Sequence, residues 1–245
     1  MIWVTGDTHG DWVHRINMDS FPEQREMTKD DYVIVLGDFG IWKDTKEQRH
    51  NLNWLDERNF TTLFIDGNHS NFDLLNSYPV SEWHGGKVHF IKDSVIHLMR
   101  GQIFNIDDQS FFTFGGARSH DISDGILEAD DPRIRRWRKD TSKMYRINHI
   151  SWWEEEMPSE EEMDEGIKNL VAVNNKVDFI LTHCTASSTQ ALMSVGRFKP
   201  DELTNYLENI RYTTEYTRWL FGHYHTNMAV SDKDICLFEQ IVRVA

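Results

Sequence analysis

The sequence predicts an α/β protein in which strands alternate with helices near both ends of the chain and form hairpins in the middle. Short apolar runs rich in β-branched and aromatic residues recur, as at residues 2–5 and 32–36. Helical patterns separate several of these runs, which favours parallel strands there. Between residues 87 and 114 the runs follow one another with tight turns, which favours antiparallel pairs. We therefore expect an α/β sandwich with mixed strand directions.

The individual elements follow from the same periodicities. The predicted strands lie at residues 2–5, 32–36, 62–65, 87–91, 95–99, 102–106, 110–114, 177–181, 218–221 and 235–244. Residues 44–58 predict a helix with Leu52 and Leu55 on one face. Ser159 and Glu162 form a capping-box pattern, so we expect a helix from there to about residue 173. Pro200 indicates the start of another helix toward residue 210.

Residues 118–158 form the least regular part of the sequence. Five basic residues fall between Arg133 and Lys139, and Trp152 and Trp153 follow. The chain has no internal repeat and no low-complexity linker. We expect one domain over residues 1–245, in which residues 118–158, called the excursion below, leave the core and line or cover the functional site.

Composition narrows the class of protein. The 245 residues carry 26 basic and 40 acidic side chains, a net charge of −14, which argues against a protein that holds nucleic acid mainly by a basic surface. Two cysteines are too few for a disulfide scaffold. No signal-peptide pattern and no apolar stretch of membrane-spanning length is visible. These observations predict a cytoplasmic protein without a membrane partner, and they leave the oligomeric state open.

Polar side chains that can bind metals follow five of the predicted strands. The first two strands end at Asp7, with His9 two residues on, and at Asp38; the others end at Asn68, at His183, and at His223 with His225. In open α/β sheets the ligand site lies beyond the carboxyl ends of the strands, so these side chains should converge. Neighbouring glycines allow the sharp turns that this convergence needs.

The converging groups are a mixed nitrogen and oxygen ligand set. Such a set suits Mn, Fe, Zn or Co better than calcium or a metal that prefers thiolates. The ligands exceed the needs of one tetrahedral site, and they fit two ions that share a bridging carboxylate. Two-metal sites of this kind hydrolyse phosphate esters, with the ions about 3.5–4 Å apart.

The five blocks resemble the motifs of the calcineurin-like metallophosphoesterase superfamily. In order, they match its D-x-H, G-D, G-N-H, H and G-H-x-H patterns, from residue 7 to residue 225. The resemblance implies a four-layer sandwich of two mixed β-sheets flanked by helices. It also implies two divalent metal ions, with Mn as the first expectation and Fe, Zn, Co or Ni as alternatives.

The resemblance further implies residue roles. Seven side chains would bind metal: Asp7, His9 and His225 the first ion, Asn68, His183 and His223 the second, and Asp38 both. A hydroxide between the ions would attack phosphorus. His69 resembles the family's histidine that binds no metal and that stabilises the transition state or protonates the leaving oxygen.

Two departures from the family patterns limit the assignment. The acidic residue that often follows G-N-H is Ser70 here, so the group that orients His69 is not identified by the sequence. The second block, Gly37-Asp38-Phe39-Gly40-Ile41-Trp42, lacks the Asp-Arg pair of the protein Ser/Thr phosphatase branch. We therefore do not assign the chain to that branch.

Several further residues are candidates for substrate binding. Arg118 and His120 follow a glycine-rich turn after an aromatic strand, and a guanidinium fits phosphate oxygens. The basic run at 133–139, with its interleaved Trp137, fits either a guide for a nucleic-acid strand or a solvated helix face, and we favour the helix face. Trp152 and Trp153 fit an anchor on the core better than a stacking site for substrate.

The expected function is metal-dependent hydrolysis of a phosphate ester, with monoester and diester both open. The acidic surface favours a small phosphorylated or nucleotide substrate. An alternative is a nuclease or RNA-end phosphatase that uses the basic run, which steep salt dependence of binding would support. A non-catalytic metal-binding scaffold is a further alternative, but scaffolds derived from such enzymes lose metal ligands, and here all the ligand positions are filled.

Overall fold

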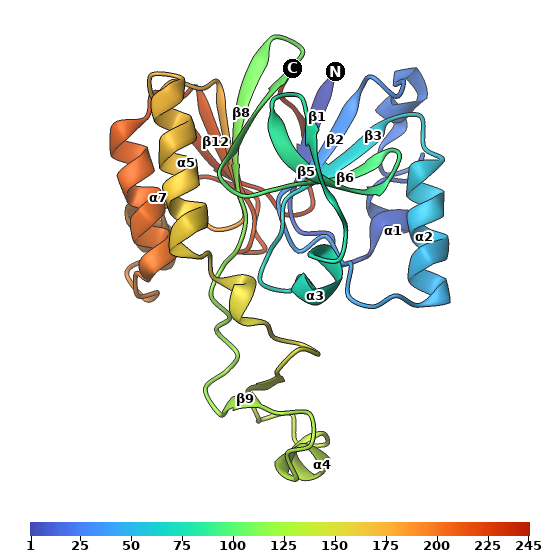
Figure 1. Cartoon of the computed structure of the whole chain (residues 1–245), viewed down its shortest axis with the longest axis vertical. Coiled ribbons are helices and arrows are strands. Elements are labelled where there is room, and N and C mark those ends of the chain that lie inside the picture. Colours follow the sequence, from blue (N-terminus) through green and yellow to red (C-terminus); the bar gives the residue numbers. More distant parts are fainter.

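Two mixed β-sheets pack face to face and helices cover their outer faces, as the computed structural model of residues 1–245 shows (Figure 1). The apolar cluster between the sheets contains residues of both, such as Ile34 of the first and Leu181 of the second. Separate clusters lie under the helices on either side. The expected four-layer α/β sandwich is confirmed.

The first sheet contains seven strands, with parallel pairing at its centre. In spatial order they are β15 (Ile241–Arg243), β1 (Ile2–Thr5), β2 (Tyr32–Val35), β3 (Thr61–Phe64), β6 (Val95–Leu98), β5 (Gly86–Lys92) and β4 (Val80–Trp83). Strands β1, β2, β3 and β6 run parallel, whereas β15, β5 and β4 pair antiparallel with their neighbours. The carboxyl ends of β1, β2 and β3 therefore lie at one edge.

The second sheet contains six strands and repeats this arrangement. In spatial order they are β13 (Met228–Ala229), β14 (Asp234–Cys236), β12 (Arg218–Phe221), β11 (Phe179–Thr182), β8 (Gln109–Phe114) and β7 (Gln102–Ile106). Strands β14, β12, β11 and β8 run parallel, and the edge strands β13 and β7 are antiparallel. The expected antiparallel pairs in the middle of the chain are β5 with β6 and β7 with β8.

Strand side chains alternate between two apolar environments. In β2, Val33 and Val35 belong to the cluster under the helices, and Ile34 belongs to the cluster between the sheets. Burial on both faces explains why the strand is a continuous apolar run without polar alternation. In β3, likewise, Phe64 belongs to the cluster under the helices and Leu63 to the cluster between the sheets.

Helices contribute to the outer apolar clusters of both sheets. Those beside the first sheet are α1 (Trp12–Arg15), α2 (Lys46–Asp56) and α3 (Phe72–Leu75), with a 3₁₀ turn at Pro22–Glu26. Those beside the second sheet are α5 (Glu160–Ala172), α6 (Ser187–Ser194) and α7 (Glu202–Thr213). None of the helices has both the length and the apolar character that a membrane crossing requires.

Two helix starts test the capping expectations. Ser159 and Glu162 form the expected capping box at the start of α5. The start of α7 differs from the expectation, because Pro200 lies outside the helix and Asp201 is its N-cap. The Asp201 carboxylate accepts a hydrogen bond from the backbone N–H of Thr204 at 2.8 Å, and the Thr204 hydroxyl accepts one from the N–H of Asp201. An aspartate satisfies the free N–H groups of a first turn, which proline cannot do.

The carboxyl-terminal segment also differs from the expectation. The apolar run at 235–244 was predicted as one strand, but it forms β14 and β15, which belong to different sheets. Leu237 lies in the cluster between the sheets, where the chain crosses from one to the other. The short strands β4 and β13 and the short helices α1, α3 and α6 carry too few residues for a periodic pattern.

The excursion projects beyond the carboxyl ends of the strands (Figure 1). It holds β9 (Gly125–Leu127), α4 (Arg133–Trp137), β10 (Tyr145–Ile147) and a 3₁₀ turn at Glu154–Glu156, with β9 and β10 paired in parallel. Asp73 of α3 anchors it: the indole Nε1 of Trp153 donates to Asp73 at 2.7 Å, and Nδ1 of His149 lies 2.9 Å away. The expected anchoring role of the tryptophan pair is therefore seen at Trp153.

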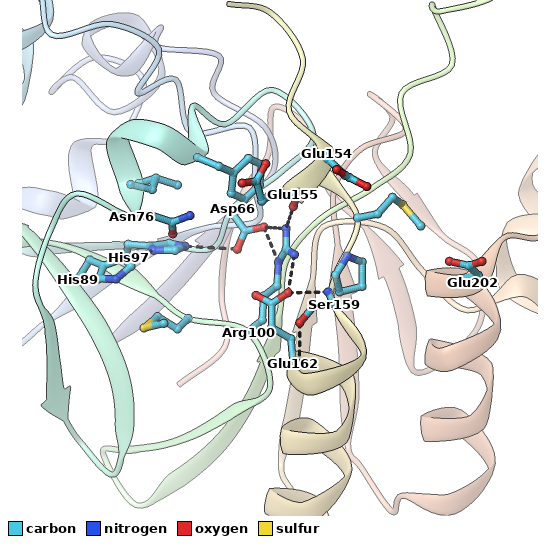
Figure 2. A pocket seen from close by; sticks show the side chains of 15 residues that line it. Asp66, Asn76, His89, His97, Arg100, Glu154, Glu155, Ser159, Glu162 and Glu202 are labelled. Atoms are coloured by element: carbon cyan, nitrogen blue, oxygen red, sulfur yellow. Dashed lines mark hydrogen bonds and ion pairs between the residues drawn. The ribbon is translucent and has the colours of Figure 1, made fainter. Parts of the chain in front are cut away.

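A buried arginine joins the first sheet, α5 and the base of the excursion (Figure 2). Nε and Nη2 of Arg100, just after β6, donate to the Asp66 carboxylate at 2.9 and 2.6 Å. Nη1 donates to Glu162 at 3.1 Å, and Nη2 also donates to the carbonyl oxygen of Glu155 at 2.7 Å. Burial alone would raise the pKa of Asp66, but Arg100 and His97 hold it well below its usual range.

We predict that Arg100→Met lowers the free energy of unfolding by about 3–5 kcal/mol, because it leaves the buried Asp66 carboxylate without its partner. Urea denaturation followed by circular dichroism measures this. Arg49→Met is the matched control, since the Arg49–Asp44 pair is exposed and such pairs contribute about 1 kcal/mol or less. Equal losses in the two variants would contradict the role given to Arg100.

Candidate metal centre

Five loops meet beyond the carboxyl ends of the strands and bring the seven predicted ligands to one place. The loops follow β1, β2 and β3 of the first sheet and β11 and β12 of the second. Because both sheets are parallel at these positions, their polar ends lie on the same side of the sandwich. The ligand atoms of Asp7, His9 and His225 lie within 4.8 Å of one another, and so do those of Asp7, Asp38 and His183.

The first group of side chains surrounds Asp7. Its Oδ1 accepts a hydrogen bond from the backbone N–H of His223 at 2.9 Å. Its Oδ2 faces imidazoles instead, with Nε2 of His225 at 3.1 Å and Nε2 of His9 at 3.8 Å. The two Nε2 atoms are 3.0 Å apart. One carboxylate oxygen and two imidazole nitrogens therefore converge on the same position.

Asp38 lies between this group and a second one. Its Oδ1 accepts a hydrogen bond from the backbone N–H of His69 at 2.8 Å. Its Oδ2 is 3.5 Å from Nε2 of His183 and 4.0 Å from Nε2 of His9. A carboxylate in this position can contact ligands of both groups, which is the geometry that a bridging ligand needs.

The second group is centred on His183, whose side chain is buried. Nδ1 of His183 donates to the carbonyl oxygen of Leu36 at 2.8 Å, which fixes the ring. Nε2 then faces Oδ1 of Asn68 at 3.1 Å. The ring of His223 packs edge-on against His183, with their centroids 5.0 Å apart. Asn68, His183 and His223 are thus neighbours beside Asp38.

The backbone around the ligands is strained. His9, Asp38, His223 and His225 have φ values of 46°, 43°, 65° and 46°, in the left-handed region that non-glycine residues rarely adopt. Such strain persists only where the surrounding structure imposes it, and it is frequent at functional sites. At Gly37, which also has a positive φ, a Cβ atom would collide with the His183 ring.

The electrostatics of the centre are dominated by buried charge. Burial would raise the pKa of Asp38, but His183 and the neighbouring histidines hold it well below its usual range. Burial would lower the pKa of His183, but Asp38 and Asp7 outweigh it and raise this pKa to about 9. Burial, together with the charge of His183, lowers the pKa of His223 well below its usual value. Positive charge beside the carboxylates is therefore strongly favoured.

The donor set fits metal ions. Oδ2 of Asp7 is buried, and no group donates it a hydrogen bond of good geometry. An unsatisfied buried carboxylate oxygen is costly unless a cation accepts its lone pairs. The surrounding imidazole nitrogens and the Asn68 oxygen are ligands that first-row transition metals accept. The residues present are therefore those that a divalent cation needs.

The side chain of His69 borders the centre, and its backbone N–H donates a hydrogen bond to Asp38. Its ring centroid is 5.7 Å from that of His9. Burial lowers the pKa of His69, Asp38 opposes this, and the nearby charge of Arg146 lowers the pKa further. Ser70 does not orient the ring, because its hydroxyl instead accepts a hydrogen bond from the backbone N–H of Gly67 at 3.0 Å.

The two predicted substrate residues have different surroundings. His120 stacks on Phe198 with centroids 5.2 Å apart and lies 5.6 Å from the ring of His223, so it borders the centre. Arg118 is half exposed, and its Nε lies 3.8 Å from Asp201 at the start of α7. It lines neither of the cavities that reach the centre beside His69 or His120.

Residues that sequence reasoning did not identify as site residues also border the centre. A cavity of about 270 Å³ is lined by His9 and His69 together with Trp42, Lys43 and Arg146. Trp42 ends the second block and Lys43 follows it, and that position was the available signal. For Arg146 the sequence indicates only that it belongs to the excursion, which we expect to line or cover the site. Another cavity, of about 590 Å³ beside Arg100 (Figure 2), is lined by none of the seven predicted ligands.

The fold and the centre define a hydrolase of the metal-dependent phosphoesterase class, and comparison with known proteins agrees. A family model described as calcineurin-like phosphoesterase matches residues 1–227. The chain therefore belongs to the calcineurin-like phosphoesterase family, whose members are metal-dependent hydrolases of phosphate esters.

Other comparisons add little. A search of the curated proteins finds no match. Among solved structures, a phosphopantetheinyl hydrolase from Mycobacterium tuberculosis matches with 14% sequence identity and a TM-score of 0.40, over 97% of this chain and 87% of that one. A similarity of this size says nothing about the substrate of the present chain.

We predict that removing metal destabilises the protein, because it leaves Asp7 and Asp38 buried without cations. A ligand at about 100 times its Kd adds about 2.7 kcal/mol. For a chain of this length, that corresponds to a Tm roughly 5–10 °C higher with Mn²⁺ than after chelation. Scanning calorimetry of stripped and refilled protein measures the difference, and an unchanged Tm would contradict the assignment of the centre.

Proposed function

We propose that the chain hydrolyses a small phosphorylated substrate with two divalent metal ions at this centre. Asp7, His9 and His225 would hold one ion, Asn68, His183 and His223 the other, and Asp38 would contact both. The observation that carries the proposal is the pair of buried carboxylates, each of which offers one oxygen to a cluster of imidazoles. When bound, such ions lower the pKa of water and neutralise charge on the phosphoryl group.

The residues of the chain supply the geometry of the reaction. The N–H groups of His223 and His69 fix the Oδ1 atoms of Asp7 and Asp38, so both Oδ2 atoms face the imidazoles with which they would hold the ions. The Leu36 carbonyl oxygen orients the His183 ring by accepting a hydrogen bond from its Nδ1–H. The His69 side chain borders the centre, where it would donate a proton to the leaving oxygen.

We predict that Asp38→Asn abolishes hydrolysis of p-nitrophenyl phosphate while the fold is kept, since the amide is neutral and close in shape to the carboxylate. The rate with Mn²⁺-loaded protein and the circular dichroism spectrum measure the two effects. Asp108→Asn is the control, because Asp108 is exposed and lies in the turn before β8, at the end of the sheet opposite the centre. Near-normal activity in a folded Asp38→Asn protein would refute the bridging role.

For His69→Ala we predict retention of bound metal with a fall in kcat of about 10²–10⁴-fold, the usual contribution of a positioned proton donor. Metal should be retained because the backbone of His69, not its side chain, contacts Asp38. Elemental analysis of the purified variant and steady-state kinetics test both parts. Loss of metal from this variant would instead make His69 a ligand.

Hydrolysis of phosphodiesters is a second candidate, and one cavity favours it. His223 and His225 border a cavity of about 310 Å³ that His120 and Phe198 also line. It shares no lining residue with the cavity beside His69, so each cavity could accommodate one ester group of a diester. The ratio of the rates on bis-p-nitrophenyl phosphate and p-nitrophenyl phosphate decides between the candidates. The basic run does not favour a nuclease, because Arg133 of α4 pairs with Asp131 and the run lines neither cavity.

A further inference from the structure

The cavity beside His69 has a composition that differs from the rest of this acidic protein. Two cationic side chains, Lys43 and Arg146, line it, and no carboxylate does. The whole chain has a net charge of −14, so a cavity with only cationic charge in its lining is unusual here. Because Asp121 pairs with Arg146, Lys43 supplies the unpaired charge of the cavity, and such a charge attracts anions.

Arg146, the arginine of the cavity, is oriented by Asp121 and keeps a free donor. Nε of Arg146 donates to Asp121 at 2.9 Å, and Nη2 donates to the other oxygen of the same carboxylate. No hydrogen bond engages Nη1, and Nζ of Lys43 has no hydrogen-bond or ion-pair partner either. Donors remain available on both cations, while Asp121 fixes the direction of the guanidinium.

The other walls are apolar and unusually exposed. Trp42 is 40% exposed and Ile150 is 49% exposed, although both are large hydrophobic side chains. Together with Trp153, they line the same cavity as His69. Exposed apolar side chains gathered in one concave place mark a binding site, and an indole face is suited to stacking on a planar ring.

We propose that this cavity holds the leaving group of the substrate, and that this group combines a planar aromatic ring with a second anionic group. The inference rests on the proposed function, in which His69 gives its proton to the leaving oxygen. A cavity that contains His69 is on the side of the phosphorus from which that oxygen departs. The ring would stack on Trp42, and the second anion would contact Lys43 and Arg146.

The size of the cavity limits the substrate. Its volume of about 270 Å³ is just below the roughly 300–1,000 Å³ that ligand cavities usually have. It accommodates a single ring system and not a polymer. A nucleoside that carries one phosphate besides the scissile one has this chemistry. In its hydrolysis the ester P–O bond breaks, the oxygen of water bonds to phosphorus, and the leaving oxygen gains a proton, giving a mononucleotide and phosphate.

Binding of the leaving group tests the inference without turnover. Isothermal titration calorimetry would measure the Kd of adenosine 5′-monophosphate for metal-stripped protein. We expect Trp42→Ala and Lys43→Gln each to raise the Kd about tenfold, since the stacking of a base on an aromatic side chain and a charge-assisted hydrogen bond each have an effect of about this size. Trp42→Phe should recover most of the affinity. Both side chains are exposed, so neither substitution should disturb folding.

Two variants serve as matched controls. Tyr212→Ala removes another exposed aromatic side chain, and Lys139→Gln removes another exposed cation. Neither residue lines the cavity, so both variants should bind like the unaltered protein. No measurable binding by the unaltered protein, or equal Kd values in all variants, would overturn the inference.

Kinetics of the Mn²⁺-loaded protein separate this inference from the proposed function. For Trp42→Ala we expect a KM about tenfold higher on adenosine 3′,5′-bisphosphate and adenosine 3′-monophosphate, but unchanged on glycerol 2-phosphate. Lys43→Gln should raise the KM only for the bisphosphate. If all three esters are hydrolysed with unaltered KM by both variants, the inference fails and the proposed function stands. If the unaltered protein hydrolyses p-nitrophenyl phosphate but neither adenosine ester, the inference fails alone. If it hydrolyses none of the three esters and not p-nitrophenyl phosphate either, the proposed function fails.

Discussion

The arrangement of the rest of the structure depends on two buried carboxylates, Asp7 and Asp38, which lie beyond the ends of the strands. An ionised carboxylate away from water is costly unless each oxygen finds a partner. Backbone N–H groups of the histidine loops satisfy one oxygen of each. The other oxygens face imidazoles, and the left-handed backbone at His9 and His225 holds these rings in place. Both the loops and the sheets are arranged so that cations can complete the site.

The excursion contributes Arg146 to the cavity that His69 also lines. Its base is fixed by Asp73 and by Arg100, which also holds Asp66 two residues before Asn68. The segment that places Arg146 beside His69 is therefore tied to the loop that carries Asn68, a predicted metal ligand. If the cavity holds the leaving group as we propose, the excursion, which lies outside the sandwich, is where we expect selectivity to arise.

The sequence predicted the sandwich and most long elements, because buried strands and amphipathic helices leave clear periodicities. It did not predict the split of the terminal run into β14 and β15, since an apolar run carries no sign of which sheet it joins. The convergence of the seven ligand candidates followed from their positions after strands. Arg146 could not be found in this way, because its approach to His69 depends on tertiary packing of the irregular excursion. Substrate binding by Arg118 stays a prediction, since its Nε lies 3.8 Å from Asp201 and the residue lines neither cavity at the centre.

The central claim is that the buried carboxylates organise two metal sites that share Asp38. The most direct test is a crystal structure of the Mn²⁺-loaded protein with anomalous diffraction recorded on both sides of the manganese edge. The account predicts two anomalous peaks about 3.5–4 Å apart, one near Asp7 and His9, the other near Asn68 and His183, with Asp38 between them. A single peak, or peaks away from Asp38, would contradict it.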